Sequence, residues 1–443
     1  MIIELPNEVN KIIKALEDKG HEAYIVGGCV RDLLMGMAPH DWDITTNALP
    51  DQIISCFAAE KIVETGLKHG TVTIIVGAIA YEVTTYRIEG KYSDCRHPDS
   101  VVFTTSLKDD LSRRDFTINA MAYNPRAGLV DYFHGKDDLL REQIICVGNP
   151  DERFHEDALR IIRALRFASV LGFQISASVS KSLLRNKDNL KKIALERINV
   201  EFCKLLCGKN VRQVLLNYSD VLEIFIPEIK DISGFAQNNP YHFLDIWQHT
   251  VEAVAQAPAD KAIRLALLFH DIGKPHCYSL NKQGLEHFYG HAQYGSELAC
   301  KIMKRLRFDG QTINTVRELI LYHDMELLPN GRQIKRLLNK MGEERLRQLL
   351  QVMQADIMGK CEIYREASLK RLRLVLQYLD HIIEQQLCFQ LKDLAVNGKD
   401  LLDIGIPQGR QIGLLLHKLM EMVINEEIEN DKKQLLIVAK SID

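Results

Sequence analysis

The feature that most constrains the fold of this 443-residue chain is a change of hydrophobic period near Pro150. Before that point, the β-branched, glycine-bounded runs AYIVGG, KIVETGL, GTVTIIVGAIAYEVTTYRI and GLVDYF have the pattern of strands and alternate with helical segments such as LPDQIISCFAAE. After it, EDALRIIRALRFASVLGF, ALERINVEFCKLL and KAIRLALLFHDIGK carry apolar residues at helical spacing. The pattern predicts an α/β part followed by an all-α part.

The length of the chain exceeds what one ordinary core accommodates, so we expect two to four domains. The stretch FAQNNPYHF marks a join near residue 236, and the expected boundaries are 1–150, 151–235, 236–385 and 386–443. The first residues lack the basic start and long apolar run of a signal peptide, and no run is long enough to span a bilayer. The ten cysteines are scattered, as in reduced thiols, and we expect a cytoplasmic protein.

Local charge differs from the net charge of -3. The segment from Arg153 to Arg212 contains thirteen Lys and Arg residues and five Asp and Glu residues, a net charge of about +8. Such a segment is typical of a phosphate-binding face or of a solvated helix surface, and charge alone leaves both open. The sequence leaves the oligomeric state undetermined.

The stretch YIVGGCVRDLLMGMAPHDWDITT combines paired glycines, an arginine and two nearby acids. On a strand, Asp41 and Asp43 would share one face, and their repulsion would be relieved by Mg²⁺. Two such ions could hold both oxygens of an in-line displacement. Gly27 and Gly28 would let a triphosphate approach the backbone at a helix N-terminus, and Arg31 would add a guanidinium fork. A tight turn before an acidic strand is the alternative.

Two further segments add phosphate-binding candidates. In YEVTTYR, a strand would place Glu82, Thr84 and Tyr86 on one face, with Glu82 as a third metal-binding acid. In LSRRDFTINAMAYN, two arginines and an aspartate precede an apolar segment with the pattern of a helix. Arg114 could hold triphosphate, and Asp115 could orient an arginine or contact a ribose, although RRD is also a common helix-capping pattern.

The segment EDALRIIRALRF offers a means of selecting a base. Asp157 and Arg160, three residues apart, would share a helix face, with Arg163 and Arg166 continuing the stripe. Arg160 can donate to a ring acceptor and Asp157 can accept from an exocyclic amine, so the pair could accept C and A and reject U and G. An ordinary ion pair has the same spacing.

These motifs, together with VDYFHGKDDL and ALERINVEF, occur in the order found in class II CCA-adding tRNA nucleotidyltransferases, and the chain resembles that family. The family is the bacterial-type branch of the polymerase-β-like superfamily and includes bacterial poly(A) polymerases. The resemblance implies an α/β head, a polymerase-β-like nucleotidyltransferase sheet with flanking helices, then an extended all-α neck, body and tail. It also implies addition of C, C and A to a tRNA 3′ end from CTP and ATP.

The resemblance further implies residue roles. Asp41 and Asp43 would bind Mg²⁺; Gly28, Arg31 and Arg114 would contact the triphosphate, and Asp115 the ribose. Asp157 and Arg160 would select the base, supported by Arg163 and Arg166. Gly135 and Asp138 would lie in a hinge motif, and Glu196 and Arg197 would begin a helix that steadies the neck.

The all-α part holds a second candidate site with the pattern H…HD…H…H…D, composed of His249, His270, Asp271, His291, His323 and Asp356. Imidazole and carboxylate ligands suit a transition metal, and Lys274 could neutralise a phosphate. The set resembles the HD phosphohydrolase domain, which implies hydrolysis of 2′-phosphates or 2′,3′-cyclic phosphates with Ni²⁺ or Mn²⁺.

Four alternatives remain open from the sequence. The segment YRIEGKYSDCRHPDSVVFTTSLKDDLSRRD looks intact, which argues against CC-only addition but leaves A-only addition possible. A bacterial poly(A) polymerase shares the motifs. A nucleotide phosphohydrolase with an inactive head, or an RNA-binding scaffold without catalysis, would be of a different class.

Overall fold

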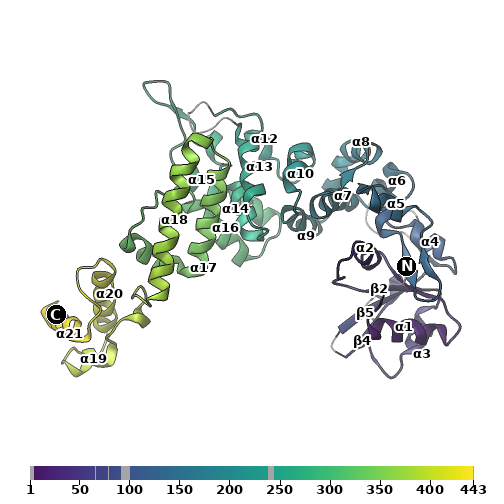
Figure 1. Cartoon of the computed structure of the whole chain (residues 1–443), viewed down its shortest axis with the longest axis horizontal. Coiled ribbons are helices and arrows are strands. Elements are labelled where there is room, and N and C mark those ends of the chain that lie inside the picture. The colour runs from purple at the N-terminus through teal and green to yellow at the C-terminus, as the bar shows by residue number, and fades with distance from the viewer. Residues whose placement is uncertain (1–3, 65, 78, 91–99, 238–243, 443) are drawn as a thin grey trace. The chain divides into compact units, whose positions relative to one another are not determined.

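A computed structural model of the chain describes residues 4–64, 66–77, 79–90, 100–237 and 244–442. It divides into two compact units, Met1–Pro227 and Glu228–Asp443. The main sheet lies in the first unit, and helices dominate the remainder of the chain, which confirms the predicted α/β part and all-α part (Figure 1). The division into four domains stays a prediction. Much of the predicted join at FAQNNPYHF, and residues 91–99 of the segment used to argue against CC-only addition, lie outside the described residues.

The first unit contains a seven-stranded sheet of order β3-β4-β5-β2-β1-β8-β9. β2 and β5 run parallel, and the other neighbouring pairs are antiparallel. The strands are β1 Ala23–Val26, β2 Asp43–Thr46, β3 Lys61–Val63, β4 Thr71–Val76, β5 Ile79–Thr85, β8 Ala122–Asn124 and β9 Gly128–Val130. A separate hairpin pairs β6 Arg87–Glu89 with β7 Val101–Phe103.

Helices supply apolar side chains to the core of this sheet. Helix α1, Asn7–Glu17, buries Val9, Ile12, Ile13 and Leu16, a spacing that forms one helical stripe. Helix α3, Pro50–Cys56, begins at its proline, as predicted. Because strand side chains alternate, Ile44 and Val83 enter this core while their neighbours Asp43 and Glu82 are exposed.

The segment after the RRD motif is not the helix that its apolar pattern predicts. Helix α4, Leu107–Ser112, ends before Arg113, so the arginines follow a helix instead of preceding one. A short 3-10 turn, η2 Thr117–Asn119, leads directly into β8. The segment after RRD ends in an extended strand because β8 pairs with β1 inside the sheet, and such tertiary pairing overrides local helix propensity.

The rest of the first unit is mainly helical. A parallel pair, β10 Gln143–Ile144 and β11 Gln174–Ile175, accompanies its helices. The helices are α2 Gly28–Leu34, α5 Gly135–Leu140, α6 Pro150–Glu156, α7 Leu159–Leu171, α8 Ala177–Asn186, α9 Leu195–Leu206, α10 Val211–Asn217 and α11 Ser219–Leu222, with 3-10 turns η1 Leu67–His69 and η3 Lys187–Lys192.

The second unit is mainly helical, with a small hairpin, β12 Ser279–Leu280 and β13 Glu286–His287, and its residues between Cys388 and Ala439 form a hydrophobic core. Helix α17 bends at Gly342, whose φ of 77° interrupts the helix. The helices are α12 Ile229–Ile232, α13 Ile246–Gln256, α14 Lys261–Phe269, α15 His291–Arg305, α16 Gly310–Tyr322, α17 Gly331–Met358, α18 Glu362–Glu384, α19 Gly398–Asp403, α20 Arg410–Ile424 and α21 Lys432–Ile442, with 3-10 turns η4 Lys274–Cys277 and η5 Leu391–Asp393.

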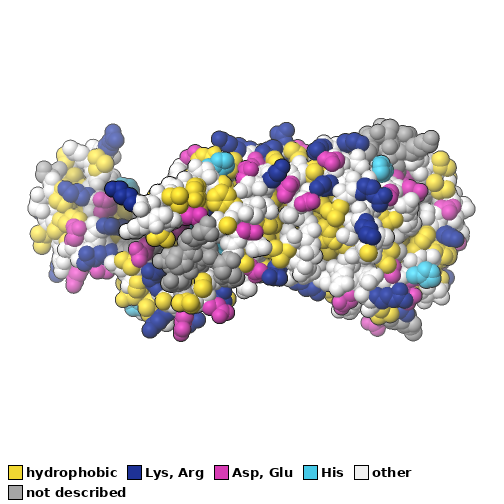
Figure 2. Space-filling view, turned by 90° about the horizontal axis from the view of Figure 1, so that it is seen from above, with side chains coloured by type: hydrophobic (Ala, Val, Ile, Leu, Met, Phe, Trp, Pro, Cys, Tyr) yellow, Lys and Arg dark blue, Asp and Glu magenta, His cyan; other side chains and the backbone are white. Residues whose placement is uncertain are grey.

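The described part of the chain has a mixed polar and apolar surface (Figure 2). Among the described residues, every helix is too short or too polar to cross a bilayer. On the face drawn in Figure 2, lysine and arginine side chains are interspersed with acidic and apolar ones and do not form one continuous basic field.

Candidate functional site

Three carboxylates gather where β2 begins. Asp43 is the first residue of β2, and its Cα partner across the parallel pair is Glu82 of β5. Asp41 precedes the strand, so the predicted placement of both aspartates on it holds for Asp43 alone. Tyr86, expected on the face of Glu82, follows the end of β5 and is fully buried in another cluster.

Two of these carboxylates have raised pKa values. Burial and the charge of Asp41 raise the pKa of Asp43, against the opposing effect of Arg114. Burial, Asp43 and Asp41 together raise the pKa of Glu82. Asp43 and Glu82 are therefore harder to ionise here, which is the environment that a bound divalent cation relieves.

The glycine pair lies next to this acidic edge, and its two members differ in what they tolerate. Gly27 has φ 81° and ψ -128° and caps helix α2, a conformation that glycine adopts without strain. A Cβ on Gly27 would lie 2.7 Å from Nη1 of Arg114, whereas one on Gly28 would lie 3.7 Å from Nη2 of Arg31. The constrained position is therefore Gly27, although the sequence prediction singled out Gly28 for triphosphate contact.

Two arginines flank the glycines. Burial lowers the pKa of Arg114, and its Nε has no hydrogen-bond partner among the described residues. Arg31 donates from Nη1 to Oδ1 of Asn119 at 2.8 Å and pairs with Asp32 at 2.6 Å. The Arg114 guanidinium therefore has spare donor capacity beside the buried backbone of Gly27.

Asp115 is buried and already paired. Its carboxylate lies 2.6 Å from Nη2 of Arg163 and accepts from Nδ2 of Asn119 at 3.1 Å. Burial alone would raise the pKa of Asp115, but Arg163 and the Asn119 hydrogen bond hold it down at about 2. Of the two predicted alternatives, orienting an arginine is the one that this geometry presents.

Phe167 joins these groups, although the sequence analysis gave it no role. Its ring lies 3.9 Å from the guanidinium carbon of Arg166, 5.2 Å from that of Arg31 and 5.5 Å from that of Arg163. Arg166 also pairs with Glu201 at 2.9 Å. Arginine over an aromatic face is favourable, so Phe167 links α2 to α7 through their cations. Its place directly after Arg166 in ALRF was the only signal in the sequence.

Asp157 and Arg160 do not face each other. Asp157 is the extended residue that ends α6, and its carboxylate pairs with Arg197 at 2.9 Å. Arg160 pairs with Glu156 at 2.6 Å and donates to the carbonyl oxygen of Arg113 at 2.9 Å. The expected shared helix face is wrong, because α7 begins only at Leu159. In this structure both side chains are therefore held by other protein groups and not by each other.

The predicted hinge motif packs against the turn after RRD. A Cβ on Gly135 would lie 2.1 Å from the carbonyl oxygen of Thr117, so glycine alone allows this approach. Asp138 accepts a hydrogen bond from Oγ1 of Thr117 at 2.7 Å. The hinge motif therefore contacts Thr117, which lies two residues after Asp115 in the chain. Glu196 and Arg197, expected to begin a helix, lie in the first turn of α9.

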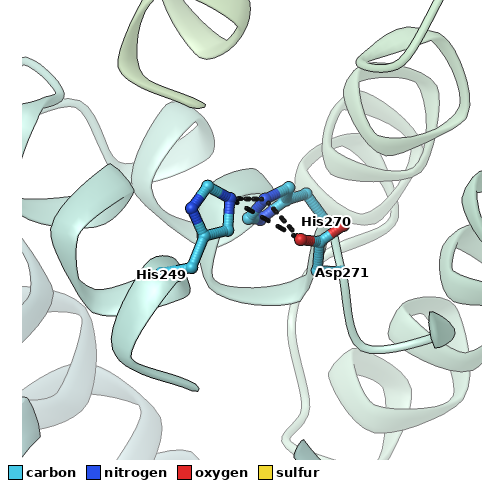
Figure 3. Close-up of side chains that lie close together, drawn as sticks. All are labelled: His249, His270 and Asp271. Carbon is cyan, nitrogen blue, oxygen red and sulfur yellow. Dashed lines mark hydrogen bonds and ion pairs between the residues drawn. The ribbon is translucent and has the colours of Figure 1, made fainter. Parts of the chain in front are cut away.

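The second candidate site lies within the second unit, where the predicted residues come together. All six are buried: His249 on α13, His270 and Asp271 after α14, His291 at the start of α15, His323 after α16 and Asp356 on α17. The side chains of His249, His270 and Asp271 point toward one another in Figure 3.

Asp271 belongs to two groups of three that could each hold a metal ion. Its Oδ2 lies 3.3 Å from Nε2 of His270 and 3.6 Å from Nε2 of His249. Its Oδ1 lies 3.5 Å from Nε2 of His291 and 3.9 Å from Nε2 of His323. Asp356 approaches the first group, with Oδ1 2.9 Å from Nε2 of His249.

The backbone orients all four imidazoles. The Nδ1 atoms of His270, His291 and His323 lie 2.6, 2.9 and 2.7 Å from the carbonyl oxygens of Leu267, Phe288 and Ile320, and Nδ1 of His249 lies 3.2 Å from that of Gly359. A carbonyl can only accept, so Nδ1 of each ring carries a proton, and Nε2 is the atom that would bind a metal once it has lost any proton of its own. This donor set fits a transition metal.

Two lysines, of which Lys274 is buried and Lys360 is partly exposed, complete the charge balance of this site. Lys274 lies 2.7 Å from Asp271, and Lys360 lies 2.6 Å from Asp356. Burial alone would lower the pKa of His270, but Asp271 and Asp356 raise it to about 10, whereas burial and the charge of His270 lower the pKa of His323 to about 3.

Comparisons with known proteins agree on one family. The model of the poly A polymerase head domain matches residues 23–146, and that of tRNA nucleotidyltransferase domain 2 matches residues 283–439. The CCA-adding enzyme of Lactobacillus delbrueckii subsp. bulgaricus is 33% identical over 432 residues, 97% of this chain and 96% of that protein. The enzyme of Levilactobacillus brevis is 34% identical over 436 residues, 98% of each.

Solved structures have the same fold. The crystal structure of the Bacillus stearothermophilus CCA-adding enzyme in complex with CTP is similar with a TM-score of 0.71 and 28% identity, over 99% of this chain and 98% of that one. The Thermotoga maritima CCA-adding enzyme complexed with tRNA_CCA has a TM-score of 0.59 at 20% identity, over 99% of this chain and 95% of that one, a likeness of fold.

Proposed function

We propose, since the chain belongs to the family of CCA-adding enzymes, that it adds C, C and A to the 3′ end of tRNA from CTP and ATP. In each step the terminal ribose 3′-oxygen forms a bond to the α-phosphorus of the nucleotide. The bond from that phosphorus to pyrophosphate breaks, and the hydroxyl proton is lost. The placement of Asp41, Asp43 and Glu82 beside Gly27 and Arg114 is the observation that supports this reaction at the head.

The residues of the head would have separate roles in binding the metal and the nucleotide. Asp41 and Asp43, with Glu82, would hold Mg²⁺, which supplies charge neutralisation at the reacting phosphate when bound. Arg114 and Arg31 would bind the triphosphate, and Gly27 and Gly28 would admit it to the start of α2. Asp115 orients Arg163 beside this site.

Base selection requires a rearrangement. Asp157 would leave Arg197, and Arg160 would leave Glu156, so that the two side chains can meet the amine and ring nitrogen of C or A. The basic segment from Arg153 to Arg212 would follow the tRNA backbone, whose charge and shape dominate such contacts.

The test uses tRNA transcripts ending before CCA, after C and after CC, each with one nucleotide at a time. We expect CTP to be used on the first two and ATP on the third, with UTP and GTP used far more slowly. Use of ATP alone, and only after CC, would indicate an A-adding enzyme, and long A tails on unrelated RNA a poly(A) polymerase. Replacing both Asp41 and Asp43 with Ala should abolish addition while tRNA binding survives; unchanged addition would contradict the site.

A second activity is supported by the shared carboxylate of Asp271. We propose that the cluster of four histidines, Asp271 and Asp356 holds Ni²⁺ or Mn²⁺ and hydrolyses 2′-phosphates or 2′,3′-cyclic phosphates of RNA ends. In the cyclic case a water oxygen bonds to phosphorus, one ribose P–O bond breaks, and that ribose oxygen takes the proton. The metal would supply an activated water when bound.

The matching assay follows hydrolysis of 2′,3′-cyclic AMP with Ni²⁺, Mn²⁺ and Mg²⁺. Asp271→Ala should abolish turnover, as should His323→Gln, which leaves the Lys274 ion pair in place. Equal rates in wild type and both variants would refute the proposal.

A further inference from the structure

We infer that a cavity beside the histidine cluster binds a nucleobase, so that this second site takes a nucleotide at an unpaired RNA end and not a base-free phosphate. The inference rests on the hydrolase activity proposed above. The cavity measures about 800 Å³, and its lining includes Lys274, His291 and Lys360. His291 is a candidate metal ligand, and the two lysines pair with Asp271 and Asp356. The volume is in the range of small-molecule sites, so a nucleotide could occupy it with its phosphate at the cluster.

The outer part of this cavity is apolar and exposed. Among the large hydrophobic side chains described, Ile363 at 82% and Tyr289 at 77% are the most exposed, and both line this cavity. The ring of Tyr289 stacks on that of His287, with centroids 4.9 Å apart and planes within 9°. An exposed aromatic platform of this kind accepts a base through its π-face, whatever the base.

The platform is anchored to the cluster through Phe288. The Phe288 ring lies 6.0 Å from that of Tyr278 and 6.4 Å from that of Phe235, and Nζ of Lys274 lies 5.5 Å from its centroid. Because Lys274 also contacts Asp271, the aromatic segment is held at a fixed place relative to the candidate metal ligands. Tyr289 is two residues before His291, so base and phosphate sites lie on one continuous segment.

The charge of the lining, three cations against the two carboxylates of Glu286 and Asp324, favours a nucleotide over an apolar peptide. Lys274, Lys360 and Arg365 line the cavity, and Nε of Arg365 has no hydrogen-bond partner among the described residues. Nη2 of Arg365 donates to the carbonyl oxygen of Lys360 at 3.0 Å, which fixes the guanidinium beside this opening. Cations next to an aromatic platform are the combination that binds a phosphate joined to a base.

The experiment compares 2′,3′-cyclic AMP with glycerol 1,2-cyclic phosphate, which has the same five-membered cyclic phosphate and no base, using the full chain with Mn²⁺. We expect Tyr289→Ala to raise KM for the nucleotide about tenfold with kcat unchanged, and to leave kcat/KM for the glycerol compound unchanged. Tyr289→Phe should behave as wild type. Tyr378→Ala, an exposed tyrosine of α18 that does not line the cavity, is the matched control.

Equal effects of Tyr289→Ala on both substrates, or no effect on either, would overturn the inference while leaving the hydrolase intact. If wild type hydrolyses neither substrate, the hydrolase proposal fails, and direct binding of 2′-AMP tests the platform separately. Binding weakened about tenfold by Tyr289→Ala would then support a base site, and equal binding would refute it.

Discussion

At the scale of single residues, Gly27 and Gly28 are adjacent but not equivalent. Gly27 combines a positive φ with a space already filled by Arg114, whereas a side chain on Gly28 would meet only ordinary contacts. We expect Gly27→Ala to raise KM for CTP and ATP at least about tenfold, because both the backbone turn and the Arg114 guanidinium must shift. Gly28→Ala is the matched comparison and should have a much smaller effect in the same assay; equal effects would contradict this ranking.

Asp115 links pH to the stability of the head. Its pKa of about 2 lies below the ordinary 3.8, so ionised Asp115 stabilises the folded state by about 2 kcal/mol. Because the folded pKa is depressed, this stability is present above pH about 4 and is lost as the pH falls toward 2.

Urea unfolding of Asp115→Asn checks this prediction. The variant should be less stable than wild type at pH 7, and the difference should shrink between pH 4 and pH 2. Asp137→Asn, an exposed carboxylate in the same unit, should show no such difference. A gap between Asp115→Asn and wild type that does not change with pH would contradict the assignment.

At the scale of elements, the junction of α6 and α7 carries the two residues proposed to choose the base. Asp157 can only accept hydrogen bonds, whereas an amide at this position can also donate to the carbonyl that uracil presents. We expect Asp157→Asn to raise the use of UTP relative to CTP by about tenfold, the value of one hydrogen bond. Nucleotide competition on a tRNA ending before CCA measures the ratio, and Glu156→Gln is the control. An unchanged ratio would remove Asp157 from base selection.

Elements whose pattern is local were predictable from the sequence. The stripe of Val9, Ile12, Ile13 and Leu16 defines α1, and the apolar run before HDIGK defines α14. The helix predicted after RRD was wrong, because pairing with β1 is a distant contact that no local pattern contains.

The candidate sites follow the same distinction. The types and the order of the acidic residues, the arginines and the histidines could be read from the sequence, and they were sufficient to identify the family. The distant partners of Asp157 and Arg160 could not be predicted from the sequence. Arg197, which pairs with Asp157, lies 40 residues away along the chain, and Arg113, whose carbonyl accepts from Arg160, lies 47 residues away. Phe167 was missed for the same reason, since its role depends on arginines from two helices meeting at one ring.

At the scale of the whole molecule, the two candidate sites lie in different compact units and share no residue. We expect their activities to separate. Paired Asp41→Ala and Asp43→Ala should abolish CCA addition and leave hydrolysis of 2′,3′-cyclic AMP unchanged, and His323→Gln should do the reverse. Both assays on each protein provide the measurement. Loss of both activities in either variant, with the fold intact by circular dichroism, would contradict independence.

The pairing of Lys274 with Asp271 and of Lys360 with Asp356 has a consequence for how this cluster would change under mutation. Removing Asp271 leaves Lys274 without its partner in a buried setting, which is strongly destabilising. Removing Asp356 leaves Lys360, which is partly exposed, without its partner, and this costs less. Selection for folding alone would therefore preserve this part of the HD pattern in a lineage that had stopped using the chemistry. Tyr289 and Ile363 are exposed and contribute little to the core, so drift would reach them first. Their fate among descendants of this chain would record whether the proposed hydrolase activity is in use.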